Sequence, residues 1–393
     1  MAPFRDIFMP LGIPLPWRQL SSSPGRFLAA LTGITFSSML MIFQMSIHSA
    51  FLDGKVLRPI RSLDADLVLV SRDSLYLYEM SSFPRTRLGQ AARLPEVAEA
   101  CAVYLNFCDW RNPRTLVRHS AVVFGVEPGH PGFTFLEQGR ALEVLKEEDA
   151  VLYDRATPSS FGPVQERVGA KGHMRAELAG KQVQVRGLFT MGSTLTCDCH
   201  LVAGTQAFFR LFPMRNPGQI DLGLVRLRPG SDPQAVRARL EQILPADVEC
   251  FTKASFAARE QRHWADRTAL GDVILPMVLV SLLTGAVVVA QILYTDVSEH
   301  LPEYAALKAL GWTDRLLFRL LLGEALQLHL LGFAMSCALA WGISAVVRSC
   351  QDLPLRMSPG TLGLIFLATG VMCVTAGLIA ARRLRSADPA DIF

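Results

Sequence analysis

The sequence predicts a membrane protein with four transmembrane α-helices and a large α+β domain inserted between the first and second helices. Four apolar runs, each 21 to 23 residues long, contain no Asp, Glu, Lys or Arg: Phe27 to Ile47, Val273 to Tyr294, Ala325 to Val347 and Thr361 to Ala381. At about 1.5 Å of rise per residue, each run can cross a hydrocarbon core of roughly 30 Å as a helix. Residues 48–272 separate the first run from the second, which predicts one large water-facing domain.

The composition agrees with this class. Hydrophobic residues make up 50% of the chain and charged residues 19%. The net charge of +4 is small and dispersed, and no basic patch is interleaved with aromatic residues. These features argue against a nucleic-acid partner.

The first apolar run is interpreted as a retained span. The core of a signal peptide is typically about 7 to 15 residues long and ends at a small-residue cleavage site. This run is longer and continues into Met45, His48 and Phe51. The leader before it mixes apolar residues with prolines and arginines, which favours a segment lying on the inner leaflet over a poorly ordered start.

The basic residues that flank the runs predict the orientation. The flanks assigned to the cytoplasm contain Arg5, Arg18, Arg26, Lys308, Arg315, Arg319, Arg382, Arg383 and Arg385. The positive-inside rule then places both termini in the cytoplasm and the inserted domain on the outer face. Lys55, Arg58 and Arg61 run against the rule, but long translocated domains tolerate such charges.

The inserted domain shows mixed α and β patterns. Short runs rich in β-branched or aromatic residues predict strands at 66–71, 102–107, 121–126, 182–189, 220–227 and 248–251. The clearest helix is Pro233 to Leu244, where Asp232 can cap the first turn. The stretches Gly125 to Gly132 and Gly169 to Lys181 are interpreted as loops.

Two further helices are expected next to the membrane. They are His48 to Leu63, after the first span, and Thr252 to Gly271, before the second. If both continue their spans outward, they form a stalk that transmits movement. The alternative is two ordinary juxtamembrane helices, with Trp264 at the level of the lipid headgroups.

The inner loop between the second and third spans contains a short amphipathic pattern, in YTDVSEHLPEYAALKALG from Tyr294 to Gly311. Pro302 can start a helix and Gly311 can end it. Such a helix cannot bury its apolar face alone. It could lie on the bilayer or dock in a groove on a partner protein.

At this loop the chain resembles the DevC-type permeases, which belong to the MacB and FtsX group of ABC transporter subunits. The segment QILYTDVSEHLPEYAALKALGWTDR, with Glu324 and Ala325 downstream, is similar to the intracellular loop of that family. Leu31 to Phe51 resembles its first span, and LRSADPADIF resembles its C-terminal ending. Between them, VFGVEPGHPGF, VLYDRA, FGPV, GLFTMG, FFRLFP and LRPGSDPQAV occur in family order, so the resemblance covers nearly the whole chain.

The resemblance implies a MacB-like fold and a homodimeric permease that works with a separate, DevA-like ABC ATPase. It further implies a DevB-like membrane-fusion adaptor, a TolC-like outer-membrane channel and contact with membrane lipid. The family's coupling helix docks into the ATPase, and it corresponds here to Leu301, Pro302, Glu303, Tyr304, Leu307, Lys308 and Gly311, with Glu299 flanking it. The implied function is mechanotransmission in an inner-membrane export system, with glycolipid or another lipid as possible cargo.

Motifs for intrinsic catalysis do not occur in the sequence. It contains no GxxxxGK[ST] phosphate loop, HExxH or GxSxG motif. We therefore expect no enzyme activity and no cofactor in this chain, with ATP hydrolysis on a partner chain. The alternatives to export are an FtsX-like mechanotransmitter that regulates an outer-face enzyme without transport, and a membrane sensor or enzyme that uses the Cys/His loop.

That loop is the clearest departure from the family pattern. Cys197, Cys199 and His200 stand where a short polar turn is expected. Thiolates and imidazole are metal ligands, but a closed zinc site normally needs four of them. Loop thiols, or a disulfide to Cys101, Cys108 or Cys250, are favoured over a metal site. In the third span, a neutral His329 hydrogen-bonded to a neighbouring helix is favoured over a proton relay.

These inferences divide the chain as follows: a cytoplasmic interfacial segment at 1–26, transmembrane helix 1 at 27–50, a periplasmic α+β domain with stalk helices at 51–270, transmembrane helix 2 at 271–295, a cytoplasmic loop with the coupling helix at 296–316, transmembrane helix 3 at 317–347, a short periplasmic loop at 348–358, transmembrane helix 4 at 359–382 and a cytoplasmic tail at 383–393.

Overall fold

The computed structural model describes residues 24–129, 132–136, 140–266, 269–299, 301, 313–350 and 357–384. The chain divides into two compact units. We call Met1–Ala50 with Ala269–Phe393 the membrane unit, and Phe51–Thr268 the inserted domain.

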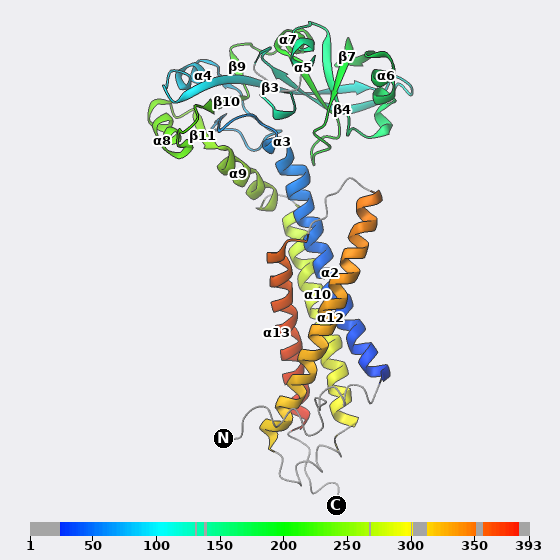
Figure 1. Ribbon diagram of the computed structural model, residues 1–393. Helices are drawn as coiled ribbons and strands as arrows, with labels where there is room; N and C mark the ends of the chain where they lie inside the picture. The colour runs from blue at the N-terminus through cyan, green and yellow to red at the C-terminus, as the bar shows by residue number, and fades with distance from the viewer. Residues whose placement is uncertain are drawn as a thin grey trace, which may run out of the picture. The chain divides into compact units, whose positions relative to one another are not determined.

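The membrane unit contains four long helices: α2 (Pro24–Phe51), α10 (Ala269–Glu299), α12 (Asp314–Cys350) and α13 (Pro359–Leu384) (Figure 1). Each includes a segment long and apolar enough to cross a membrane. The predicted fold class, four membrane-crossing helices with a large domain between the first and second, is confirmed. The chain is a multi-pass membrane protein.

The inserted domain is built on a nine-stranded sheet with the order β11-β1-β10-β3-β4-β8-β5-β7-β6 (Figure 1). Its first four strands, all antiparallel to their neighbours, are β11 (Val248–Thr252), β1 (Leu67–Ser71), β10 (Leu222–Leu227) and β3 (Val97–Arg111). Helices α4 (Thr86–Ala91) and α8 (Pro233–Ile243) complete two βαβ halves, β1-α4-β3 and β10-α8-β11. This is the split βαβ arrangement of a ferredoxin-like unit.

A second lobe is inserted into that unit between β3 and β10. It contains β4 (Arg118–Val126), β5 (Ala150–Asp154), β6 (Met174–Leu178), β7 (Lys181–Phe189) and β8 (His200–Gly204), with α5 (Arg140–Val144), α6 (Val164–Lys171) and α7 (Thr205–Leu211). The 15-residue strand β3 pairs with β10 near one end and with β4 near the other. One continuous sheet therefore joins the two lobes. A separate two-stranded sheet pairs β2 (Phe83–Pro84) with β9 (Gln219–Ile220).

Most predicted strands are confirmed, and the cap of α8 is confirmed because the Asp232 side chain accepts a hydrogen bond from the Gln234 amide. The predicted loop Gly169 to Lys181 is wrong. Gly172, with φ of +74°, ends α6, and the next residues form β6. Ala179 and Gly180, with φ of +51° and +72°, then make the tight β6–β7 turn. In β6, the charged residues Arg175 and Glu177 alternate with buried residues. Over only five residues, this alternation does not distinguish a strand from a loop in the sequence.

Two core clusters cover the sheet. One includes Tyr104, Trp110 and Phe208, and the other includes Val68, Phe124 and Phe256. Phe256 lies on α9 (Lys253–Asp266) and packs in the same cluster as residues of η1 (Leu52–Val56), a π-helix, and α3 (Leu57–Arg61). The two chain segments that enter and leave the inserted domain are therefore packed into one core.

Candidate functional site

The membrane unit has a core to which all four long helices contribute. Ile34 of α2, Leu293 of α10, Leu321 of α12 and Met372 of α13 are buried in one cluster. Leucine, valine and methionine side chains elsewhere on α10, α12 and α13 are exposed. In a bilayer these exposed side chains can contact lipid tails, so the apolar composition serves both packing and solvation.

Glycines allow close approach between the helices of this bundle. A Cβ at Gly285 would lie 2.6 Å from Ser37 Oγ and 2.9 Å from Met372 Sδ. A Cβ at Gly332 would lie 2.6 Å from Ile34 Cγ2. Small residues at helix contacts are typical of membrane bundles, where packing replaces the hydrophobic effect as the driving force.

Polar contacts add to this packing along α2. Thr35 Oγ1 donates to the Gly332 carbonyl at 3.4 Å, and Gln44 Nε2 donates to Ser281 Oγ at 3.2 Å. The first contact joins α2 to α12, and the second joins α2 to α10. Such bonds are specific because an alternative packing leaves a polar group unpaired in hydrocarbon.

The predicted coupling helix falls mostly outside the described residues. Pro302, Glu303, Tyr304, Leu307, Lys308 and Gly311 are not described. Glu299 ends α10, and Leu301 is partly buried against the bundle core that Val297 and Leu317 share. The assignment of the coupling residues therefore stays a prediction.

His329 differs from its prediction. It is 2% exposed in α12, and its ring lies 4.6 Å from the Phe366 ring. Within the part of the chain that the structure describes, neither ring nitrogen has a hydrogen-bond partner, so the predicted bond to a neighbouring helix is wrong. The reason is local, because the imidazole lies against Gly370 of α13 and beside the rings of Phe333 and Phe366.

The entry segment of the inserted domain is attached to the loop before β8. Lys55 Nζ, in the π-helix η1, donates to Ser193 Oγ at 2.8 Å. Arg58 Nη1, in α3, donates to the Met191 carbonyl at 3.3 Å. A π-helix is uncommon and often marks a functional position. The basic residues that ran against the positive-inside rule thus include two that hold this loop.

Asp154 lies at the end of β5 beneath the same loop. Its side chain is fully buried and accepts hydrogen bonds from the backbone amides of Ala156, Met191 and Gly192 at 2.7 to 3.1 Å. Burial raises the pKa of the Asp154 carboxyl, while these amides and the Arg58 guanidinium lower it. The carboxyl group therefore anchors the loop through three directed bonds.

His200 is part of a buried polar cluster and not of a turn. It begins the central strand β8, and its Nε2 lies 3.1 Å from Tyr78 Oη and 3.4 Å from Thr194 Oγ1. Its Nδ1 is 3.9 Å from Asp154 Oδ2. Burial lowers the pKa of His200 to about 3, so the imidazole is neutral and this approach is not an ion pair.

The two loop cysteines belong to different cores. Cys197 packs in the cluster with Phe124 and donates to the Ser120 carbonyl at 3.4 Å. Cys199 packs in the cluster with Trp110 on the other side of the sheet. Burial raises the pKa of both thiols.

Candidate metal ligands do not gather in the described residues, where no three His, Cys, Asp or Glu side chains are grouped as a metal ion requires. Cys101, Cys108, Cys197, Cys199 and Cys250 are free thiols. The cysteine motif is thus accounted for by buried packing.

Glu260 is a buried carboxyl that the sequence did not single out. It lies on α9, is 2% exposed, and its Oε1 has no hydrogen-bond partner among the described residues. Burial raises its pKa to about 7 from an ordinary value of 4.5, opposed by a backbone hydrogen bond from Leu77 and by Arg259. A glutamate on an amphipathic helix is normally a surface residue, so no sequence signal marked it.

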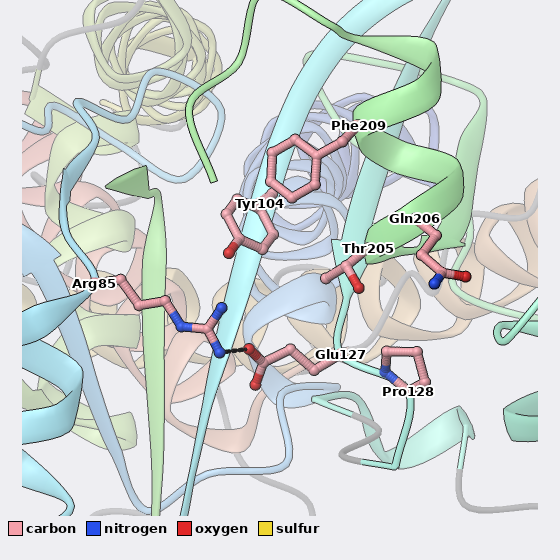
Figure 2. Close-up of a pocket in the computed structure, with 7 residues that line it drawn as sticks. All are labelled: Arg85, Tyr104, Glu127, Pro128, Thr205, Gln206 and Phe209. Atoms are coloured by element: carbon pink, nitrogen blue, oxygen red, sulfur yellow. Dashed lines mark hydrogen bonds and ion pairs between the residues drawn. The ribbon is translucent and has the colours of Figure 1, made fainter. Parts of the chain in front are cut away.

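An open cavity of about 580 Å³ lies between β3, the end of β4 and α7 (Figure 2). The rings of Tyr104 and Phe209 meet edge to face at 5.0 Å on one side. On the other side Arg85 and Glu127 form an ion pair. Because the two charges satisfy each other and the tyrosine hydroxyl donates to the Pro217 carbonyl, the cavity has no unpaired charge to define a ligand.

Comparison with known proteins adds a family and two relatives. Residues 276–389 match the family of FtsX-like permease C-terminal domains. The macrolide export ATP-binding/permease protein MacB of Agrobacterium fabrum is 27% identical over 171 residues, which cover 42% of this chain and 26% of that protein. The MacB of Syntrophobacter fumaroxidans is 26% identical over 185 residues, which cover 45% and 25%. The chain spans about a quarter of the length of these relatives.

Solved structures with similarity include the periplasmic region of MacB from Actinobacillus actinomycetemcomitans, at 10% identity and a TM-score of 0.36, covering 52% of this chain and 96% of that one. The extracellular domain of the noncanonic ABC-type transporter YknZ from Gram-positive bacteria matches at 10% identity and a TM-score of 0.33, covering 48% and 100%. A domain of a putative permease from Porphyromonas gingivalis matches at 12% identity and a TM-score of 0.31, covering 47% and 88%.

Proposed function

We propose that this chain, which is similar to FtsX-like permeases and to MacB, is the permease subunit of an export system powered by a separate ATPase. The resemblance found in the sequence is confirmed at the level of this group. Its placement among the DevC-type permeases belongs to the proposal, as does lipid or glycolipid cargo.

The observation that carries the proposal is the shared core of the entry and exit segments of the inserted domain. Val56 and Ile60, just after the first span, pack in one cluster with Phe256, just before the second. Lys253 Nζ also donates to the Leu63 carbonyl. A displacement of either segment must move the other, because a close-packed core does not deform continuously. This is the property that mechanical transmission requires.

On the inner face, the proposed coupling helix docks into a DevA-like ATPase. Its residues are Leu301, Pro302, Glu303, Tyr304, Leu307, Lys308 and Gly311. The apolar face of so short a helix gains stability only by burial against a partner or a bilayer. The active unit contains a second copy of this chain, and both termini are cytoplasmic.

On the outer face, the inserted domain contacts a DevB-like adaptor that continues to a TolC-like channel. The FtsX-like family match also favours a second candidate, a mechanotransmitter that activates an outer-face enzyme without transport. The two functions share the inner-face coupling and differ in the outer partner.

The experiment that tests the proposal is co-purification of the ATPase with a coupling-helix variant. Burying a Leu or Tyr side chain contributes roughly 1.5 to 3 kcal/mol, so Tyr304→Ala combined with Leu307→Ala should weaken ATPase binding by a large factor. The matched control is Met214→Ala in the inserted domain, where the side chain is 96% exposed and the ATPase should still co-purify.

Wild-type recovery of the ATPase with the double variant, together with normal membrane insertion, would contradict the coupling assignment. The purified chain alone should hydrolyse no ATP, because its sequence has no phosphate loop.

A further inference from the structure

A second cavity, of about 410 Å³, lies on the inserted domain beside α9. Two arginines and one histidine from successive turns of this helix line it: Arg259, Arg262 and His263. Residues three and four apart in a helix lie on one face, so these side chains converge on the same space. Asp266, one turn further, is the one carboxylate among the lining residues.

The first arginine is held in place by its neighbours. The Arg259 guanidinium carbon lies 5.1 Å from the centre of the Phe251 ring, and Arg259 donates to the Ser74 carbonyl. On the same helix, His263 stacks on Tyr76 with ring centres 4.8 Å apart. The cavity is therefore preformed and does not depend on ordering by a ligand.

The second arginine remains available. Arg262 is exposed, and its Nε donates to the Ala258 carbonyl of its own helix at 3.3 Å. Among the described residues, this contact to a backbone carbonyl is not accompanied by an ion pair to a carboxylate. Guanidinium groups are always charged and bind phosphate or carboxylate groups through directed hydrogen bonds.

Apolar surface adjoins these charges. Leu75 lines the cavity and is 45% exposed, and Phe251 lines the same cavity. A free inorganic anion gains nothing from such surface, whereas the glycerol and first methylenes of a lipid would be partly buried against it. The combination matches an anionic head joined to an apolar body.

The chain itself limits the distance from this cavity to the bilayer. Seven residue steps separate Asp266 from Val273, where the membrane-crossing segment of α10 begins. A fully extended chain of that length spans at most about 25 Å, and a helical one about 10 Å. The chain therefore keeps the Asp266 end of α9 within about 25 Å of the start of the membrane-crossing segment.

We propose that the α9 cavity binds the phosphate headgroup of an anionic membrane lipid, with Arg262 and Arg259 contacting the phosphate and Leu75 contacting the apolar part. Asp266 opposes the phosphate and weakens the site. The proposal rests on the inserted domain and its linkage to the membrane, and it does not depend on the proposed export function.

The test titrates the full chain in neutral detergent micelles with dihexanoyl phosphatidylglycerol, using calorimetry with a micelle blank. Arg262→Gln should raise the Kd roughly fivefold, the effect of about 1 kcal/mol at an exposed charge. Asp266→Asn should lower it by a similar factor, and both exposed positions leave the fold intact. Arg118→Gln, an exposed arginine on β4 with the same charge change, should leave the Kd within about twofold of wild type.

Three further probes identify the source of the phosphate. Weak binding of inorganic phosphate and of dihexanoyl phosphatidylcholine would support an anionic lipid. Inorganic phosphate that binds as tightly as the lipid would overturn the lipid assignment in favour of a free anion. Binding of an acidic peptide without binding of the lipid would overturn the lipid assignment in favour of a protein partner. If Arg118→Gln raised the Kd as much as Arg262→Gln, the binding would depend on the net charge of the protein and not on the α9 cavity.

Discussion

The side chain of Asp154 joins the end of β5 to the loop before β8. It accepts three backbone hydrogen bonds and is attracted by Arg58, whose own bond holds the Met191 carbonyl. Asp154→Ala leaves these amides and a guanidinium without their partner. We expect the free energy of unfolding to fall by about 3 kcal/mol, because buried groups left unpaired are costly.

Thermal or chemical unfolding of the purified chain in detergent measures this effect. Asp198→Ala is the matched control, since Asp198 is an exposed aspartate in the same loop and should change stability by less than about 0.5 kcal/mol. Equal effects of the two substitutions would show that the directed bonds to Asp154 contribute nothing.

Glu260 predicts how stability depends on pH. Its pKa is about 7 in the folded domain and 4.5 ordinarily, so between these values the folded domain holds a proton that the unfolded chain has lost. The contribution of Glu260 to the free energy of unfolding therefore falls by about 3 kcal/mol at most as pH rises from 4.5 to 7. Above pH 7 this contribution is constant. Glu260→Gln should remove this fall and unfold at a higher temperature than wild type at pH 8.

The variant must be compared with wild type at each pH. His200, whose pKa burial lowers to about 3, acts in the opposite direction and destabilises the domain as pH falls below 6.5. The difference between the two proteins isolates Glu260. Glu166→Gln, at an exposed position on α6, should follow the wild-type curve, and a Glu260→Gln curve parallel to wild type would refute the assignment.

Among the elements, the close contact between α2 and α10 requires a residue without a side chain at Gly285. A leucine at Gly285 would overlap Ser37 and Met372, which lie 2.6 to 2.9 Å from its Cβ position. We expect Gly285→Leu to lower the unfolding temperature in detergent, at a cost of about 1 to 3 kcal/mol from overpacking. Gly342→Leu on α12 is the control, because nothing lies within 4 Å of its Cβ.

At the scale of the whole molecule, orientation can be tested with a well-chosen cysteine. Met214 is 96% exposed, so Met214→Cys should react with a membrane-impermeant maleimide added to the outer face of the membrane. Cysteines introduced at positions 305 and 390 should react only after the membrane is opened. Protection of Met214→Cys until then would reverse the orientation.

The amino-acid sequence was enough to predict the membrane class, the four membrane-crossing helices and the insertion point of the large domain. These features depend on composition and local periodicity, since a run of 21 residues without charged side chains is typical of a transmembrane helix. Most strands and the capped α8 were readable for the same reason. The short strands β5 and β8 were missed because their pairing with strands far away in the sequence, and not their local pattern, makes them strands. The strand β6 pairs with the next strand, β7, and was missed because its five residues are too short a pattern.

The surroundings of the chemically distinctive residues become clear only in the folded domain. Cys197 and Cys199 look like neighbouring ligands in the chain, but the irregular backbone before β8 places them in different cores. Asp154 and Gly192 lie 38 positions apart, and Lys55 and Ser193 lie 138 apart, yet hydrogen bonds join each pair. Burial lowers the pKa of His200 and raises the pKa of Glu260. Such contacts and burial follow from the packing of the whole domain, which no local stretch of sequence encodes.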